Sequence, residues 1–167
     1  MYTGAIEAVV GLLAQYGLLA LLVVFTLEGA LVGKFIPSRT LFIATVLAVG
    51  TDAVGVLSVF AAAVIGATVG QVVLFAFVRH TETTPEMLPG AFAVEDGRVS
   101  EWFDRWGLPA VVLSNAVPVV RGALTVPAAM TEENALRFSA FSMAGTSVYA
   151  SSLLAVAVGV DVLRVLL

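Results

Sequence analysis

Residues 53–78 read AVGVLSVFAAAVIGATVGQVVLFAFV, a run of 26 residues without a single charge. About 20 consecutive apolar residues are enough for a helix to cross the hydrocarbon core of a bilayer. Two further uncharged runs reach that length, with 20 residues at 8–27 and 23 residues at 138–160. The sequence therefore predicts helices that span a membrane.

The overall composition supports the same class. Of the 167 residues, 60% are hydrophobic and 12% are charged, whereas an average soluble domain is about half apolar and about a quarter charged. Six of the twelve acidic residues fall within 79–107, so the charges are unevenly distributed along the chain. We expect a single membrane domain over residues 1–167, placed in the cell membrane as a multi-pass integral protein.

Three other uncharged runs are too short to span a membrane: 40–51, 106–120 and 122–131. The last two flank a lone cation, Arg121, and Pro118 lies three residues before it. A broken apolar segment of about 10–14 residues suits a re-entrant hairpin better than a span. Irregular backbone at membrane depth is tolerated only where protein or a water-filled cavity covers it. Pro37 precedes the run at 40–51, so we expect Pro37 and Pro118 to break two loops inside the membrane.

The order of these segments repeats along the chain. QYGLLALLVV at 15–24 resembles RWGLPAVVLS at 105–114, and each stretch leads to a proline followed by an arginine. Each copy then reaches a polar turn and a long apolar segment with a glycine near its middle, Gly66 or Gly145. Gly66 and Gly70 form a GxxxG motif, which lets helices approach closely. Repeats of interrupted hydrophobic segments in matching positions point to a transporter-like binding site.

Together these patterns predict an all-α polytopic membrane protein with two inverted-repeat halves. Each half is expected to contain a proline-broken re-entrant helical hairpin followed by a long transmembrane helix. We place the halves at about 8–78 and 108–163, joined by an acidic linker at 79–107 that contains the aromatic stretch SEWFDRW. Aromatic residues of this kind are enriched at the membrane interface.

The residue inventory argues against several classes of function. The chain has no cysteine and lacks the HExxH and GxSxG motifs of metalloproteases and serine hydrolases. We therefore expect no enzymatic activity, no cofactor and no bound metal, and a membrane phosphatase or protease is the least favoured class. With one lysine, seven arginines and a pI near 4.8, the chain has no basic footprint for a nucleic acid.

Arg121 needs the most explanation, because 15 uncharged residues precede it and ten follow it. Burying an arginine at membrane depth costs roughly 2.5–3.5 kcal/mol on insertion scales. Glu28 is the best protein partner, because it is the only acid between the first apolar run and the first proline loop. A guanidinium is also a two-pronged donor suited to phosphate. Two compatible roles stay open: a structural pair that joins the loops, and a pair that opens to bind an anion.

Other polar residues lie in or beside the same segments. Arg39 is a candidate second phosphate contact, although it can equally extend to the interface together with Lys34. Asn115 and Gln71 can hydrogen-bond a headgroup, but polar side chains between helices more often serve to join them. The candidate substrate-binding residues are Arg121, Arg39, Asn115 and Gln71.

Two regions carry a family pattern. The stretch EWFDRWGLPAVVLSNAVPVVRGALTVPAAMTEENALRFSAFSMAGTSVY at 101–149 resembles the second half of the DedA family, also called the SNARE-associated or VTT domain family. The stretches LEGALVGKFIPSRT at 27–40 and GATVGQVVLFAFVR at 66–79 are similar to its first half. The resemblance covers about residues 15–160. The matching positions are Glu28, Pro37, Gly70, Phe75, Arg79, Arg105, Gly107, Pro118, Arg121, Ala128, Met130, Arg137, Phe138 and Gly145.

Four positions depart from the family pattern. Arg39 stands where a second Glu is usual, and Gln71 replaces an Asp. Asn115 replaces the first Arg of the Arg-Phe-x-Pro-x-x-Arg motif, and Tyr149 stands at a Trp position.

The resemblance implies two re-entrant loops that meet tip to tip, and a function in moving phospholipids or polyprenyl-phosphate carriers across the bilayer. We therefore expect a lipid transporter or flippase whose partner is an anionic phosphate headgroup, with Glu28 carrying a proton or ion. Two alternatives remain: a secondary transporter for an ion or small solute, and a membrane-assembly factor without transport. Because 167 residues is small for a transporter, a homodimer is a reasonable expectation.

Overall fold

The fold is described from a computed structural model that covers residues 2–32, 36–49, 52–81, 97–131 and 134–166. Within these residues every regular element is a helix, and no strand is present. Lys34 and most of the expected linker lie outside the described residues. In chain order the helices are α1 (Tyr2–Gly29), α2 (Ser38–Val49), α3 (Ala53–Thr81), α4 (Gly97–Trp106), α5 (Leu108–Ala116), α6 (Thr125–Met130) and α7 (Ala135–Leu166).

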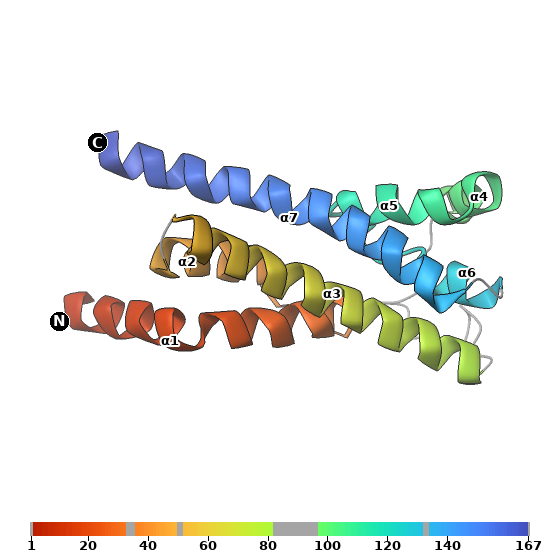
Figure 1. Cartoon of the computed structure of the whole chain (residues 1–167), viewed down its shortest axis with the longest axis horizontal. Coiled ribbons are helices and arrows are strands. Elements are labelled where there is room, and N and C mark those ends of the chain that lie inside the picture. Colours follow the sequence, from red (N-terminus) through yellow and green to blue (C-terminus); the bar gives the residue numbers. More distant parts are fainter. Residues whose placement is uncertain (1, 33–35, 50–51, 82–96, 132–133, 167) are drawn as a thin grey trace.

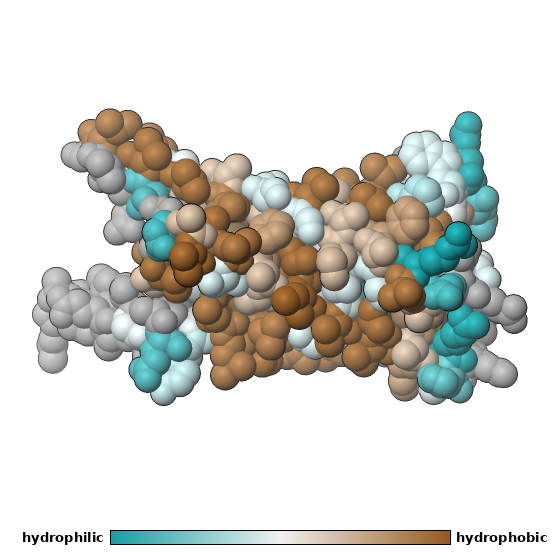
Figure 2. Space-filling model, viewed as in Figure 1, coloured by the Kyte–Doolittle hydropathy of each residue, from teal (hydrophilic) through white to brown (hydrophobic). Residues whose placement is uncertain are grey.

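The long uncharged runs form the long helices. The run at 8–27 lies in α1, the run at 53–78 in α3 and the run at 138–160 in α7. Of these, α3 and α7 are long and apolar enough to cross a membrane. Figure 2 shows hydrophobic residues over the middle of the visible face and hydrophilic residues toward its ends. This is the distribution that a protein embedded in a bilayer requires.

The pair α1 and α2 and the pair α5 and α6 enter the molecule from opposite ends (Figure 1). Helices α1 and α2 pack together at the end that holds both termini, and the C-terminal end of α1 lies near the middle of the molecule. Helices α5 and α6 lie toward the other end and are joined by a turn at 117–124. Helix α2 packs on α7, whereas α6 packs on α3. Each short segment therefore contacts the long helix of the other half of the chain.

Glycines at matching positions of the two halves allow the helices to pack closely. A Cβ added to Gly66 of α3 would lie 2.6 Å from the carbonyl oxygen of Leu22 in α1. A Cβ added to Gly145 of α7 would lie 2.5 Å from the carbonyl oxygen of Val112 in α5. Leu22 and Val112 each stand eighth in the two repeated stretches, so the sequence repeat is also a repeat of packing. Gly70 lies against the α1 backbone in the same way, which confirms the role expected of the GxxxG motif.

Two apolar cores flank a polar layer that crosses α3 and α7. One core joins α1, α2, α3 and α7 around residues such as Phe25. The other joins α3 to α4, α5, α6 and α7, and in it the rings of Phe75 and Phe138 stack with centroids 4.7 Å apart. Between the two cores, α3 carries Gln71 and α7 carries Ser142, and both side chains are fully buried. The candidate site lies at this level.

Candidate functional site

Glu28 and Arg121 form a buried ion pair between the two halves of the chain. Glu28 lies in the last turn of α1, and Arg121 lies in the turn that joins α5 to α6. The Nη1 atom of Arg121 is 3.2 Å from the Oε1 atom of Glu28, and their side chains are only 6% and 19% exposed, respectively. The pairing expected from the sequence is confirmed. Breaking a buried pair leaves an uncompensated charge. This contact therefore couples the end of α1, which is followed by a turn at residues 30–32, to the turn at 117–124.

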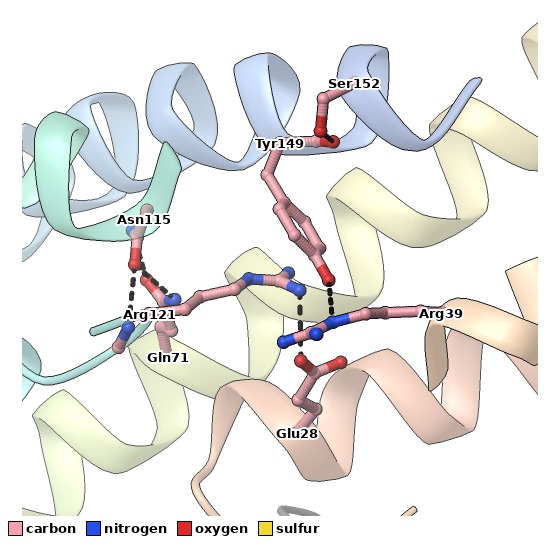
Figure 3. Close-up of polar contacts among 8 residues, drawn as sticks. Glu28, Arg39, Gln71, Asn115, Arg121, Tyr149 and Ser152 are labelled. Atoms are coloured by element: carbon pink, nitrogen blue, oxygen red, sulfur yellow. Dashed lines mark hydrogen bonds and ion pairs between the residues drawn. The ribbon is translucent and has the colours of Figure 1, made fainter. Parts of the chain in front are cut away.

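Two aromatic rings also surround the guanidinium group of Arg121. Its central carbon lies 4.2 Å from the ring centroid of Tyr149 and 5.2 Å from that of Phe25. Cations this close to a ring face are attracted by its quadrupole, by about 2 kcal/mol or more where water is excluded. The hydroxyl of Tyr149 in turn accepts a hydrogen bond of 3.1 Å from the Nε–H of Arg39. Figure 3 shows both arginines meeting beneath the tyrosine ring.

The ion pair leaves part of each charged group without a partner. The Oε2 atom of Glu28 and the Nη2 atom of Arg121 are both buried and accept or donate no hydrogen bond within the described residues. A buried polar atom that lacks a partner costs about 1–3 kcal/mol, and more when it is charged. Both residues therefore keep the capacity to bind something further.

A cavity of about 240 Å³ lies beside the pair. Of the residues expected to form a site, Glu28, Arg39, Gln71, Pro118 and Arg121 line it, whereas Asn115 and Pro37 do not. The remaining lining residues are Gly29, Leu31, Val119 and Gly122. The cavity thus brings together two cations and one carboxylate at the level where the two turns meet.

A network of amide groups fixes the turn that carries Arg121. The side-chain amides of Gln71 and Asn115 exchange two hydrogen bonds, of 2.9 and 2.8 Å. Asn115 Oδ1 also accepts a hydrogen bond of 3.1 Å from the backbone N–H of Gly122, and the hydroxyl of Ser142 donates to Gln71. Both amides are fully buried. Of the two roles left open from the sequence, this geometry gives Asn115 and Gln71 the role of joining helices, although Gln71 also faces the cavity.

The two turns touch each other directly. Gly122 has a φ of 75°, and a Cβ at this position would lie 3.1 Å from the side chain of Leu31 in the other turn. Only glycine adopts such a backbone at no steric cost. Leu31 itself has a φ of 61°, which is uncommon for a residue with a side chain and is typical of functional sites.

The prolines stand where the helices are interrupted. Helix α5 ends at Ala116, two residues before Pro118. Pro37 directly precedes α2, and its carbonyl accepts a hydrogen bond from the N–H of Leu41. Both prolines therefore separate helices at the ends of the turns.

The sequence did not single out Tyr149, Phe25 or Ser142 as site residues. An aromatic or a serine within a long apolar run gives no local signal, because the same residues commonly serve as helix packing. The signal that existed was positional, since Tyr149 stands four residues after Gly145, the central glycine of the second repeat. Among the residues that the structure describes, no group of three His, Asp or Glu side chains is placed to hold a metal ion.

Comparison with known proteins gives two matches. Residues 36–159 match the model of the VTT domain. The chain is also similar to "Undecaprenyl phosphate transporter A" of Staphylococcus aureus, with 24% identity over 148 residues, which cover 82% of this chain and 70% of that protein. No solved structure matches the chain.

Proposed function

Because this chain belongs to the VTT domain family, also called the DedA family, we propose that it is a membrane transporter that carries the phosphate headgroup of a lipid across the bilayer. The observation that carries this function is the buried pair of Arg121 and Glu28, each with an unpartnered atom, beside a cavity that Arg39 also lines. Ionisable groups at membrane depth are expensive, and they mark transport pathways more often than structure.

The chemistry of the cavity favours an anionic phosphate group. A guanidinium donates two parallel hydrogen bonds to phosphate oxygens, and the unpartnered Nη2 atom of Arg121 is available for such a bond. Arg39, which belongs to α2 in the other half of the chain, supplies a second guanidinium to the cavity lining. The volume of about 240 Å³ is smaller than the roughly 300–1,000 Å³ of pockets that enclose a drug-sized ligand. It therefore suits a headgroup whose hydrocarbon chain stays in the lipid.

The substrate class that we propose is a polyprenyl phosphate or a phospholipid. The relative from Staphylococcus aureus is named for the transport of undecaprenyl phosphate, a lipid with a phosphate group at one end. We take undecaprenyl phosphate as the first substrate to test for this chain.

We further propose that the two turns are re-entrant. In this arrangement α3 and α7 cross the membrane, the α1–α2 hairpin enters from one side and the α5–α6 segment from the other. The opposite directions of these helices in Figure 1 and the hydrophobic middle of the molecule in Figure 2 support it. The cavity would then lie near the bilayer midplane, where repeat transporters hold their substrates.

Glu28 is proposed to carry a proton. When a phosphate group binds Arg121, the carboxylate of Glu28 loses its partner although its side chain is only 19% exposed. An unpaired buried charge costs several kcal/mol, and protonation of Glu28 removes that charge. Release of the phosphate restores the ion pair and expels the proton. Proton movement and headgroup movement are thereby coupled.

One observation favours the second candidate function, an assembly factor without transport. The Glu28–Arg121 pair joins α1 to the turn between α5 and α6, and the Gln71–Asn115 pair joins α3 to α5, as structural contacts do. A protein with that function would not move lipid at all, so a transport assay separates the two candidates.

The test uses purified protein reconstituted into phospholipid vesicles that contain undecaprenyl phosphate. We expect the parent protein to move the lipid between leaflets, and Arg121→Gln to reduce the rate to that of protein-free vesicles. Arg137→Gln is the matched control, because Arg137 is exposed at the start of α7 and does not line the cavity. Parent-like movement by Arg121→Gln would remove the proposed site.

A further inference from the structure

Tyr149 is a large polar residue that has no role in the transport cycle proposed above. It has the largest fully buried side chain among the described residues, and it lies near the middle of α7. It does not line the cavity. It nevertheless contacts both arginines that do, through two different parts of the same side chain.

The two contacts are chemically distinct. The face of the ring lies against the guanidinium of Arg121, at 4.2 Å from its central carbon. The phenol oxygen accepts the hydrogen bond from Nε of Arg39. Arg121 belongs to the α5–α6 turn and Arg39 to α2, so one side chain on α7 holds cations from both halves of the chain.

Holding two guanidinium groups near each other requires an attractive partner. Like charges repel, more strongly at the lower effective dielectric of a protein than in water, and the ion pair of Glu28 is formed with Arg121. The negative ring face and the oxygen lone pairs of Tyr149 supply attraction to both cations without adding a full charge. A phosphate group that enters the cavity therefore keeps a net attraction to the arginines.

Packing alone does not explain a tyrosine at this position. Gly70 stands four residues after Gly66 in α3, and Tyr149 stands four residues after Gly145 in α7. In the first half the glycine brings the backbones of α1 and α3 into contact. In the second half the same position carries an aromatic ring that is placed against Arg121 instead. The two repeats therefore differ at Tyr149, the residue that contacts Arg39 and Arg121.

We propose that Tyr149 is a positioning residue that orients Arg39 and Arg121 so that both engage the same phosphate group. This role rests on the proposed function. The hydrogen bond to Tyr149 uses the Nε atom of Arg39, so the terminal nitrogens of Arg39 are not needed to anchor it. The ring holds Arg121 in a pose where Nη1 reaches Glu28 and Nη2 is left for the substrate.

The two contacts of Tyr149 can be removed separately. Tyr149→Phe keeps the ring and removes the acceptor for Arg39, whereas Tyr149→Leu removes both contacts. The matched control is Tyr16→Phe, because Tyr16 is 54% exposed on α1. Each variant is purified, checked for parent-like thermal unfolding, and reconstituted into vesicles with increasing contents of undecaprenyl phosphate. The apparent KM and the maximal rate of movement between leaflets are then measured.

A positioning role predicts a change in KM that a purely structural role does not. We expect Tyr149→Phe to raise the apparent KM about tenfold, the value of one hydrogen bond to a charged group, with a maximal rate within about twofold of the parent. Tyr149→Leu should raise KM further, because the contact with Arg121 is lost too. In an Arg39→Gln background, Tyr149→Phe should have no additional effect, whereas Tyr149→Leu should still act through Arg121.

The failure of this role differs from failure of the proposed function. A parent-like KM for Tyr149→Phe would overturn the positioning role, as would an equal effect of Tyr149→Phe with and without Arg39. A fall in maximal rate and thermal stability at unchanged KM would assign Tyr149 to structure alone. If the parent protein itself moves no undecaprenyl phosphate above the rate of empty vesicles, the proposed function and the positioning role both fall.

Discussion

The amide pair of Gln71 and Asn115 allows a quantitative test of how the Arg121 turn is held. In Asn115→Leu, two buried donors lose their acceptor: the Nε2 group of Gln71 and the backbone N–H of Gly122. Each orphaned donor costs about 1–3 kcal/mol, so the free energy of unfolding should fall by about 2–6 kcal/mol. In Gln71→Met, the amide nitrogen of Asn115 keeps only a long contact of 3.5 Å with the carbonyl of Ser142. We expect that variant to lose about 1–3 kcal/mol.

The double variant tests whether Gln71 and Asn115 stabilise the protein as a pair or through two independent contacts. When both amides are replaced, the N–H of Gly122 is the one donor of this network left without an acceptor. The hydroxyl of Ser142 can rotate and donate to a backbone carbonyl of α7, as Ser139 and Ser147 do. Gln71→Met with Asn115→Leu should therefore cost only about 1–3 kcal/mol, which is less than Asn115→Leu alone.

The measurement is unfolding of the purified protein by sodium dodecyl sulfate in mixed micelles, followed by far-ultraviolet circular dichroism. Gln15→Met is the control for the chemical change, because Gln15 is exposed on α1, and it should alter the free energy by less than about 0.5 kcal/mol. If the double variant loses the sum of the two single losses, the amides do not act as a pair. The account of how Asn115 holds the turn at Gly122 would then be wrong.

Three further outcomes follow from the geometry. Gly70→Ala should lose more than about 2 kcal/mol of unfolding free energy through overpacking, because the added Cβ would overlap the α1 backbone. Gly159→Ala is the control, because the space around its Cβ is open. It should unfold at no lower dodecyl sulfate content than the parent. Trp102 and Trp106 are the two tryptophans of the chain, and both are exposed on α4. Lipids with bromine near the headgroup should quench their fluorescence more strongly than lipids with bromine at the end of the acyl chain. The reverse order would exclude an interfacial position of α4. Glu28→Gln should still move undecaprenyl phosphate but lose its acceleration by a pH gradient, and retained acceleration would assign the proton elsewhere.

The helices were predictable because membrane insertion leaves a long uncharged signature. The run at 53–78 predicts α3 (Ala53–Thr81) closely, and the extra residues at its end are polar ones that a hydropathy argument cannot assign to a helix. The short α6 (Thr125–Met130) and the turn at 117–124 were visible only as an interrupted apolar run. Where such a run turns depends on contacts such as that of Gly122 with Leu31, which the sequence does not reveal.

Partners within the site were predictable only where charge restricts the choice. Glu28 was identified as the partner of Arg121 because the first half offers almost no other acid. Gln71 and Asn115 lie 44 residues apart, and neutral amides have many potential partners, so their pairing could not be derived from spacing. Tyr149 was hidden for a different reason, since its role comes from two cations that approach it from other helices.

The positions that depart from the family pattern contact each other in pairs. Arg39, which stands at a usual Glu, is bonded to Tyr149, which stands at a usual Trp. An indole N–H can only donate a hydrogen bond, so a tryptophan could not accept the Nε–H of Arg39 as the phenol oxygen does. Gln71 and Asn115, which stand at a usual Asp and Arg, are bonded to each other. Two neutral amides thus pair at positions where the family pattern has an acid and a base, and each change is accommodated by its neighbour.

These exchanges alter the charge that a substrate meets. Among the described residues that line the cavity, Arg39 and Arg121 contribute two positive charges and Glu28 one negative charge, a net charge of +1. A phosphate monoester carries about −1.5 to −2 charges near pH 7, so it overcompensates this site while Glu28 is ionised. Protonation of Glu28 raises the net charge of the lining to +2, which balances a dianion. Since an unbalanced charge is costly where water is excluded, the phosphate and the proton should bind together, and Arg39 is the residue that makes their charges match.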